Sequence, residues 1–378
     1  MKILVLVHEY PPVGGGGGRV AQDLCAGLTE RGHQIRILTA QCGNLPRVEI
    51  QDDVEVIRLK SGRKVPYRAN FSAMLGFVVA SVWAGLKHIR KSRPDVIHVH
   101  FAVPAGVSAF VLSRLTRIPY VVTAHLGDVP GGVPEKTNKW FRWVFPFTPV
   151  IWRNAARIAA VSQFTRELAL KSYDVKIDVI PNGVDLKALN PGQLSLNNPP
   201  RIVFAGRFTE QKNPIKLLEV LVQIADIPWQ CTLIGDGPLR PAMQAVVEKA
   251  NLGDRVNFSG WIKPERVIDQ YRKADLMFMP SFSEGLPVVG VQALAMGLAL
   301  VLSNVGGNIE LVDHGINGYA YDPDDTKGFV TALRELLLDP IQLSKFRQAS
   351  RVKSEKFTMS YVTDQYESLL VQAINNPT

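Results

Sequence analysis

The sequence has few cysteines and no cluster of metal-ligating residues. Its 378 residues include three cysteines, Cys25, Cys42 and Cys231, which have neither paired nor metal-ligand spacing. Free thiols in this number are typical of a reducing compartment and argue against a disulfide-stapled secreted domain. His, Cys, Asp and Glu show no metal-site spacing either. We therefore expect a cytoplasmic protein without a metal or a bound cofactor.

Three other signals are absent. A strand is expected at residues 2–7 with no cleavage site before it, so no signal peptide is predicted. The longest nearly apolar run, residues 71–86, is shorter than the ~18–20 residues that span a bilayer. The glycine run 14–18 fails the Gly-x-Gly-x-x-Gly fingerprint, because Arg19 or Val20 stands where the last glycine belongs. An NAD oxidoreductase is therefore disfavoured, and no nucleic-acid-binding motif is present.

Length, composition and charge indicate a two-domain α/β chain with a basic N-terminal half. A chain of 378 residues with 46% hydrophobic content can build two sizeable cores. The net charge is +9, and residues 1–180 carry 24 Lys and Arg against 13 Asp and Glu, hence +11. The remainder carries 19 against 21, hence −2. The basic half favours an anionic partner, such as a phospholipid surface or a phosphorylated substrate.

The segment 279–307 places one acidic residue at the mouth of a loop. Glu284 lies between Ser283 and Gly285 in a stretch of turn residues. An apolar helix is predicted for residues 288–296, ended by Gly297, and a strand for residues 298–302. Backbone amides at such a helix start can bind an anionic or hydroxyl-rich ligand.

This segment resembles the donor-binding segment of the retaining glycosyltransferases of family 4, which have the GT-B fold. The family has Glu-Gly-Phe-Pro and a second Glu eight positions after the first. This chain has Glu284, Gly285, Leu286 and Pro287, then Gln292. The resemblance implies that Glu284 holds hydroxyls of the donor sugar and that the amides from Gly285 to Val288 contact sugar and phosphate. Gln292 replaces a Glu that grips the ribose, which predicts roughly tenfold weaker donor binding.

Further segments match the same family. Gly206, Arg207 and Lys212 match its Gly-Arg and the Lys five residues later. Two cations are what a leaving diphosphate requires in the absence of a metal. Gly15 and Gly16 match the family's glycine loop, which implies that they close on the phosphate from the opposite domain.

A histidine segment completes the implied site. Thr123 and His125 match the family's Thr-x-His at the end of a predicted strand, residues 120–124. The carboxyl ends of parallel strands are where open α/β sheets bind ligands. The resemblance implies that His125 positions donor and acceptor, and Asp128 joins it as a predicted substrate-binding residue. His98 and His100 are interpreted as structural.

The resemblance implies two Rossmann-like domains facing a central cleft. Residues 1–185, with a C-terminal helix at about 360–378, form the acceptor-side domain. Residues 186–200 are the linker by composition, and residues 201–359 form the nucleotide-sugar-binding domain. The implied activity is metal-independent hexosyl transfer with retention. UDP-sugars are favoured as donors, with GDP-mannose as an alternative.

Two other functions stay open. Gln292 favours a catalytically weak or inactive nucleotide-sugar-binding scaffold. A nucleotide-sugar epimerase shares the two-domain fold, but the Glu284 loop argues against it.

Charge and aromatic residues suggest where the acceptor lies. Basic clusters at residues 58–68 and 87–93 flank the apolar run 71–86, and residues 140–152 are rich in aromatic side chains. Such mixtures suit an anionic membrane interface. We expect a peripheral enzyme on the inner face of the cell membrane, acting on a lipid-linked or membrane-bound acceptor in polysaccharide or glycolipid assembly. A soluble acceptor such as a sugar phosphate is the rival.

Overall fold

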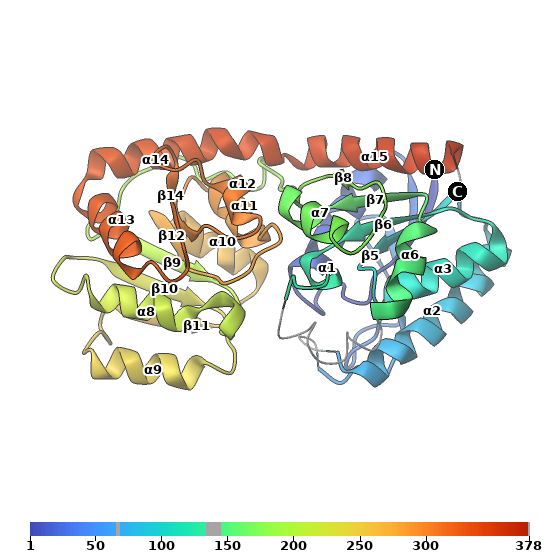
Figure 1. Ribbon diagram of the computed structural model, residues 1–378, viewed down its shortest axis with the longest axis horizontal. Helices are drawn as coiled ribbons and strands as arrows, with labels where there is room; N and C mark the ends of the chain where they lie inside the picture. The colour runs from blue at the N-terminus through green and yellow to red at the C-terminus, as the bar shows by residue number, and fades with distance from the viewer. Residues whose placement is uncertain (66–68, 134–144, 377–378) are drawn as a thin grey trace. The chain divides into compact units, whose positions relative to one another are not determined.

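A computed structural model describes residues 1–65, 69–133 and 145–376 of the chain (Figure 1). The chain divides into two compact units. Unit 1 comprises Met1–Gly183 and Met359–Thr378, and unit 2 comprises Val184–Thr358. Each unit holds a largely or wholly parallel β-sheet covered by helices, which confirms the predicted α/β class.

Unit 1 is built on an eight-stranded sheet with the order β3-β4-β2-β1-β5-β6-β7-β8. All neighbouring pairs are parallel except β3 with β4. Its central strands are rich in apolar residues because helices cover both faces. The strands are β1 (Lys2–Leu6), β2 (Gln34–Ala40), β3 (Val48–Gln51), β4 (Val54–Leu59), β5 (Val96–His100), β6 (Tyr120–Ala124), β7 (Arg157–Ala160) and β8 (Asp178–Val179).

Two helical layers cover this sheet. One core includes α1 (Gly16–Glu30) and α15 (Met359–Asn375). The core on the other face includes α2 (Phe71–Lys91), α3 (Ala105–Thr116), α6 (Thr148–Arg153) and α7 (Gln163–Leu170). Ser162 caps α7 as predicted, since its hydroxyl accepts the Thr165 N–H at 3.1 Å. The described residues of unit 1 also form the 3-10 turns η1 (Leu126–Asp128) and η2 (Phe145–Phe147).

Helix α2 corrects the expectation that no segment reaches a spanning length. The helix has 21 residues, because the basic residues after the apolar run continue it to Lys91. By length and composition alone it could cross a membrane, although 28% of its most apolar window is buried in the fold. Phe77, Ser81 and Gly85 lie on its buried face, and the Ser81 hydroxyl donates to Ser108 of α3 at 2.7 Å. In this fold α2 is therefore a half-buried surface helix.

The basic cluster at residues 58–68 is divided between surface and interior, since Lys60 and Lys64 are exposed and two arginines are not. Arg58 and Arg63 are 1% and 6% exposed. Arg58 pairs with Glu49, and Arg63 bonds to Glu9 and to the His8 carbonyl. Arg68 lies outside the described residues, as do residues 140–144 of the aromatic stretch. These two buried arginines hold the unit together instead of facing an anionic partner.

The rest of the aromatic stretch is divided between core and surface. Trp152 is buried and stacks on Tyr173 with ring centroids 4.3 Å apart. Phe147 is 72% exposed. Core packing therefore accounts for one of these rings, and the other faces solvent.

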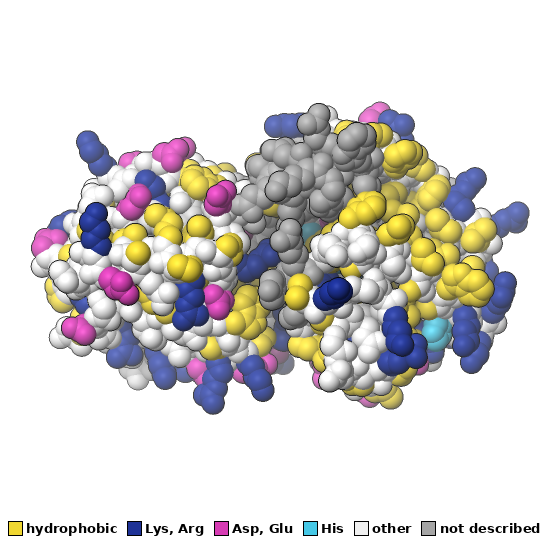
Figure 2. Space-filling view, turned by 90° about the horizontal axis from the view of Figure 1, so that it is seen from below, with side chains coloured by type: hydrophobic (Ala, Val, Ile, Leu, Met, Phe, Trp, Pro, Cys, Tyr) yellow, Lys and Arg dark blue, Asp and Glu magenta, His cyan; other side chains and the backbone are white. Residues whose placement is uncertain are grey.

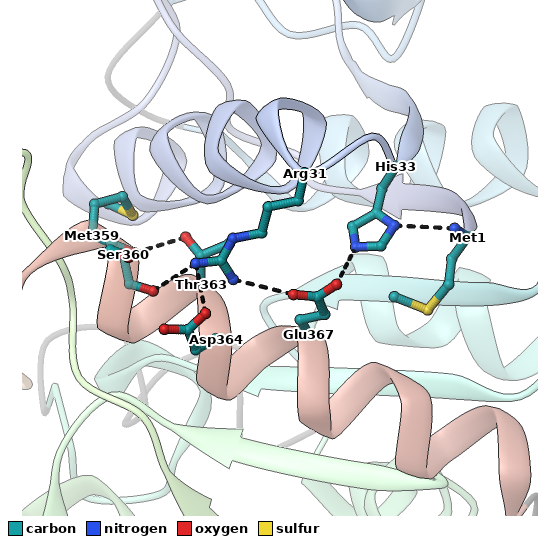
Figure 3. A network of polar contacts seen from close by, with 8 residues as sticks. All are labelled: Met1, Arg31, His33, Met359, Ser360, Thr363, Asp364 and Glu367. Carbon is teal, nitrogen blue, oxygen red and sulfur yellow. Dashed lines mark hydrogen bonds and ion pairs between the residues drawn. The ribbon is translucent and has the colours of Figure 1, made fainter.

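Helix α15 is fastened to unit 1 by both apolar and charged contacts (Figure 3). Its residues Tyr366 and Leu370 enter the core of the α1 side. Glu367 accepts from His33 at 2.8 Å and from Arg31 at 3.2 Å, and Arg31 also pairs with Asp364 at 2.7 Å. The bond from His33, aided by Arg31, holds the pKa of Glu367 below its ordinary value. The chain thus returns to its first unit and is held there.

Unit 2 is built on a six-stranded, wholly parallel sheet with the order β11-β10-β9-β12-β13-β14. The strands are β9 (Arg201–Ala205), β10 (Gln230–Ile234), β11 (Val256–Gly260), β12 (Leu276–Met279), β13 (Ala299–Ser303) and β14 (Gly318–Tyr321). The helices are α8 (Pro214–Val222), α9 (Arg240–Lys249), α10 (Pro264–Arg272), α11 (Val288–Ala295), α12 (Asn308–Leu311), α13 (Thr326–Leu338) and α14 (Pro340–Lys353), with 3-10 turns η3 (Glu210–Lys212) and η4 (Ser354–Phe357).

The segment with linker composition is held to unit 2 by a buried ion pair. Arg347 Nη1 lies 2.8 Å from Asp275 Oδ1, with side chains 4% and 0% exposed. The same guanidinium donates to the Ser195 carbonyl, and Asp275 accepts from the backbone of Asn197 and Arg201. The segment around Ser195 and Asn197 is thereby fixed on unit 2.

Candidate functional site

The predicted residues of unit 2 lie where its parallel strands end. Gly206 follows β9, and Glu284 lies in the loop after β12. The loop after β13 carries Gly306 and Gly307. Because β9, β12 and β13 are neighbours and parallel, these loops share one edge of the sheet.

A nearly buried ion pair occupies this edge. Lys212 Nζ lies 2.5 Å from Glu284 Oε1, and the two side chains are 15% and 5% exposed. Gly206 lies beneath the lysine stem, since a Cβ there would come within 3.6 Å of the Lys212 side chain. Gly206, Lys212 and Glu284, which are distant in sequence, are therefore brought together. The pair presents a cation and a carboxylate side by side.

The loop that carries Glu284 is held by close backbone contacts with the loop that carries Gly306 and Gly307. The Gly307 N–H donates to the Glu284 carbonyl at 3.0 Å. A Cβ on Gly306, whose φ is +53°, would lie 1.9 Å from the same carbonyl oxygen, and one on Gly307 would lie 1.7 Å from the Gly285 carbonyl oxygen. Only glycine fits at either position, so the loop after β13 sets the position of the Glu284 loop after β12.

A side chain that the sequence did not single out ties the lysine segment to the glutamate loop. Gln211 donates through Nε2 to the Ser283 carbonyl at 2.9 Å. The backbone carbonyl of Gln211 accepts the Phe282 N–H at 2.8 Å. Both partners immediately precede Glu284 in the chain. Apart from its place beside Lys212, nothing in the sequence marks Gln211.

Helix α11 begins directly after this loop. Leu286 and Pro287 are buried, and Val288, the first helical residue, is half-buried. The first amides of an α-helix have no partner within the helix and carry partial positive charge. Gln292 lies one turn further along and is half-buried.

Arg207 is the predicted cation that the fold does not engage. Its side chain is exposed, and it makes no side-chain hydrogen bond or ion pair with any residue in the described part of the chain. Its carbonyl accepts the Thr209 N–H, which shapes the turn. Arg207 thus offers a full set of donors to a ligand, whereas Lys212 already has a carboxylate partner.

In unit 1 the glycine run is partly helical, which corrects its interpretation as a loop. Helix α1 starts at Gly16 with Gly15 as its N-cap, and both residues are exposed. A Cβ on Gly18 would lie 2.5 Å from the Glu9 carbonyl, whereas one on Gly15 would meet nothing within 4 Å. Packing requires glycine at position 18 but not at position 15. Gly15 and Gly16 therefore form an uncovered helix start of the kind that binds anions.

His125 lies at the carboxyl end of β6 and is held by Asp128. The His125 N–H donates to Asp128 Oδ2 at 2.9 Å, and the Asp128 N–H donates to the His125 ring. The accepting atom is Nδ1, because Nε2 has no partner among the described residues. The neutral ring therefore carries its proton on Nε2. His125 thus presents an N–H donor.

Asp128 supports His125 from inside the fold. It is 2% exposed, and its other oxygen accepts the Val103 N–H at 3.4 Å. Each carboxylate oxygen of Asp128 accepts one backbone N–H, so the residue positions His125, and its predicted contact with substrate stays a prediction.

Three buried histidines lie in a row here. His98 and His100 are fully buried, and the His100 ring stacks on that of His125 with centroids 5.8 Å apart. His98 bonds to Thr123, whose hydroxyl donates to Tyr366 of α15 at 3.2 Å. Burial lowers the pKa of His98 to about 3 and that of His125 to about 4, and lowers that of His100 well below its ordinary value. The row is neutral at physiological pH.

Comparison with known proteins decides the family. The family described as Glycosyltransferase Family 4 matches residues 14–188, and that described as Glycosyl transferases group 1 matches residues 188–353. The chain belongs to glycosyltransferase family 4. TuaC of Bacillus subtilis, assigned to teichuronic acid biosynthesis, is 30% identical to this glycosyltransferase over 272 residues, 69% of this chain and 66% of TuaC. The D-inositol 3-phosphate glycosyltransferase of Xylanimonas cellulosilytica is 25% identical over 385 residues, covering 92% and 90% of the two chains.

Solved structures confirm the GT-B fold of this glycosyltransferase. Sucrose-phosphate synthase from Thermosynechococcus elongatus matches with a TM-score of 0.87 at 24% identity, over 99% of both chains. Anabaena HepE in complex with UDP-glucose matches with a TM-score of 0.78 at 19% identity, over 98% of this chain and 99% of HepE. The enzyme is thus a nucleotide-sugar-dependent glycosyltransferase of a retaining family.

Among the residues that the structure describes, no group of three or more His, Cys, Asp and Glu side chains could hold a metal ion. Independence from metal ions stays a prediction for this glycosyltransferase, as do the roles of its individual site residues.

Proposed function

We propose that this family 4 enzyme transfers a hexose from a UDP-sugar to a lipid-linked or membrane-bound acceptor, with retention at the anomeric carbon. The choice of UDP is supported by HepE, whose structures hold UDP, UDP with glucose, and UDP-glucose. GDP-mannose is the alternative donor. TuaC, whose name places it in teichuronic acid biosynthesis, supports a role in polysaccharide assembly.

The Lys212–Glu284 pair carries the proposal. Glu284 Oε1 contacts Lys212, so its second oxygen can accept a hydroxyl of the donor sugar, while Lys212 and the unengaged Arg207 face the diphosphate. As the sugar–phosphate bond breaks, negative charge grows on the leaving diphosphate. Lys212, which Glu284 holds in place, and the unengaged guanidinium of Arg207 stabilise that charge. The start of α11 adds backbone donors beside them.

The configuration at the anomeric carbon is retained because the acceptor attacks this carbon from the same face as the departing diphosphate. A Glu284 carboxylate bonded to an ammonium is a poor nucleophile, so a covalent sugar–enzyme intermediate is disfavoured. The acceptor oxygen forms its bond to the anomeric carbon as the bond to the phosphate oxygen breaks. The acceptor proton passes to that phosphate oxygen. His125 serves as a neutral donor to a substrate oxygen, since its Nε2 carries the proton.

Arg207→Ala tests the diphosphate role. The wild type is first screened by thermal shift with UDP-, GDP- and ADP-sugars, and turnover is then measured with the stabilising donor. Loss of one partner of a desolvated charge contact costs about 2–5 kcal/mol, so turnover should fall roughly thirtyfold or more. Arg266→Ala is the matched control, because Arg266 is a highly exposed arginine on α10. Wild-type turnover in Arg207→Ala would refute the assignment.

An inactive nucleotide-sugar-binding scaffold is the second candidate, favoured by Gln292. Gln292→Glu restores the family's charge and should tighten UDP binding about tenfold if the side chain meets the ribose. Isothermal titration measures this change. The scaffold would be established instead by a wild type that binds the donor tightly but catalyses neither donor hydrolysis nor transfer.

A membrane acceptor and a position on the inner membrane face are supported by the +11 charge of residues 1–180. A soluble sugar phosphate is the rival acceptor, since a basic site suits it as well. Transfer assays with lipid-linked and with soluble phosphorylated acceptors distinguish the two.

A further inference from the structure

One face of helix α2 is apolar and uncovered. Leu75, Val79 and Trp83 recur every fourth residue and are 55%, 56% and 77% exposed. Phe71, one turn earlier, is 55% exposed. From Phe71 to Trp83 the row extends for ~18 Å along the helix. Large apolar side chains scattered singly are ordinary on a protein surface, but a continuous row marks an interaction site.

The same helix ends in a basic cluster. Lys87, Arg90 and Lys91 are exposed in its last turn and the turn before it. Helices α2, α3 and α6, which pack next to one another on this side of the sheet, contain no Asp or Glu. Hydrophobic side chains gather on this part of unit 1, with Lys and Arg at its outer edge (Figure 2). The surface therefore combines apolar contact area with charge of one sign.

We propose that this α2 face is a docking surface for an anionic lipid bilayer. Helix α2 lies in the plane of the headgroups, as amphipathic helices do. Leu75, Val79 and Trp83 enter the acyl boundary, and the basic end contacts anionic headgroups. The opposite face of α2 is occupied by the core, so the helix does not cross the bilayer. The inference rests on the proposed function only for the location of the acceptor.

A second copy of the chain fits this face less well. A two-fold contact through α2 would place the Lys87, Arg90 and Lys91 clusters of both copies on one interface. Each copy brings positive charge and the three helices supply no acidic residue to offset it, so such a contact is repulsive. An anionic bilayer is complementary to both parts of the surface.

Vesicle sedimentation of the full chain tests the surface. Vesicles of phosphatidylcholine with phosphatidylglycerol are compared with phosphatidylcholine alone, at low and high salt. Leu75→Ser/Val79→Ser/Trp83→Ser should lower the partition coefficient at least tenfold. The matched control is Leu338→Ser/Ile341→Ser/Val352→Ser on α13 and α14, whose side chains are 58%, 69% and 66% exposed; it should bind like the wild type.

A fluorescent label reports insertion directly and does not depend on the triple variant. The three native cysteines are buried, so a Val79→Cys variant reacts selectively at position 79 with an environment-sensitive dye. Its fluorescence should rise with anionic vesicles, whereas the same dye on Ile341→Cys should not respond. Lys87→Glu/Lys91→Glu should abolish the preference for anionic vesicles.

The inference would be overturned if the wild type did not bind anionic vesicles at low salt, or if the triple variant bound them as well as the wild type. It would also be overturned if the wild type were a dimer, the triple variant a monomer, and neither bound vesicles. Donor hydrolysis separates this inference from the proposed function. The triple variant should keep wild-type hydrolysis. If the wild type lacks turnover with every donor but shows the predicted vesicle pattern, the proposed function fails and the surface stands.

Discussion

Replacing Lys212 with methionine should destabilise unit 2 far more than the loss of an exposed ion pair. Methionine keeps most of the lysine stem and removes the ammonium 2.5 Å from Glu284. The Glu284 side chain is 5% exposed, so its carboxylate cannot recover full hydration. Removing one partner of a buried pair costs about 3–5 kcal/mol. In a unit of this size 1 kcal/mol shifts Tm by about 2–4 °C, so a decrease of roughly 6–20 °C is expected.

Scanning calorimetry of the donor-free protein measures this shift. Lys212→Met/Glu284→Gln removes both charges and should recover most of the loss, which a double-mutant cycle expresses as a coupling free energy. Arg272→Met is the control, because Arg272 pairs with Asp269 at 3.0 Å while both side chains are more than 40% exposed. A Lys212→Met protein that melts within about 2 °C of the wild type would show that the pair is not the buried contact described above.

Three further predictions concern the row of buried histidines and the buried Arg347–Asp275 ion pair. His125→Gln, which can keep an N–H donor near the Nε2 position, should retain more turnover than His125→Asn; equal loss in both would contradict the donor role. Because burial lowers the pKa of His98, His100 and His125, the unfolded chain binds the extra protons below pH 6.5. The free energy of unfolding that these neutral histidines contribute is fully present above that pH and falls by about 1.4 kcal/mol per histidine per pH unit below it. Urea unfolding at pH 7.5 and 5.5 measures this dependence. His100→Phe should reduce the change in unfolding free energy between the two pH values. Arg347→Leu should cost about 3–5 kcal/mol in calorimetry by leaving Asp275 unpaired, and an unchanged Tm would refute the buried pair.

Local patterns in the sequence determined the elements and the family. Apolar runs predicted strands at residues 2–7 and 120–124, where β1 and β6 lie, because strands covered on both faces have few polar positions. The motif around Glu284 and the Arg207–Lys212 spacing carry the family resemblance, since chemistry at a loop depends on residue type in a short segment. The charge of the N-terminal half was also readable from composition alone.

Contacts between distant segments required the tertiary structure. No local pattern shows that Lys212 pairs with Glu284, that Gln211 ties their loops together, or that Asp128 serves His125 from inside the fold. Composition counted Arg58 as surface charge, whereas long-range packing buries it against Glu49. Sequence spacing gives the faces of an isolated helix, but packing decides which face of α2 is covered. The reason is physical: burial and partnership depend on which elements meet, and that is set by the order of strands in the sheet.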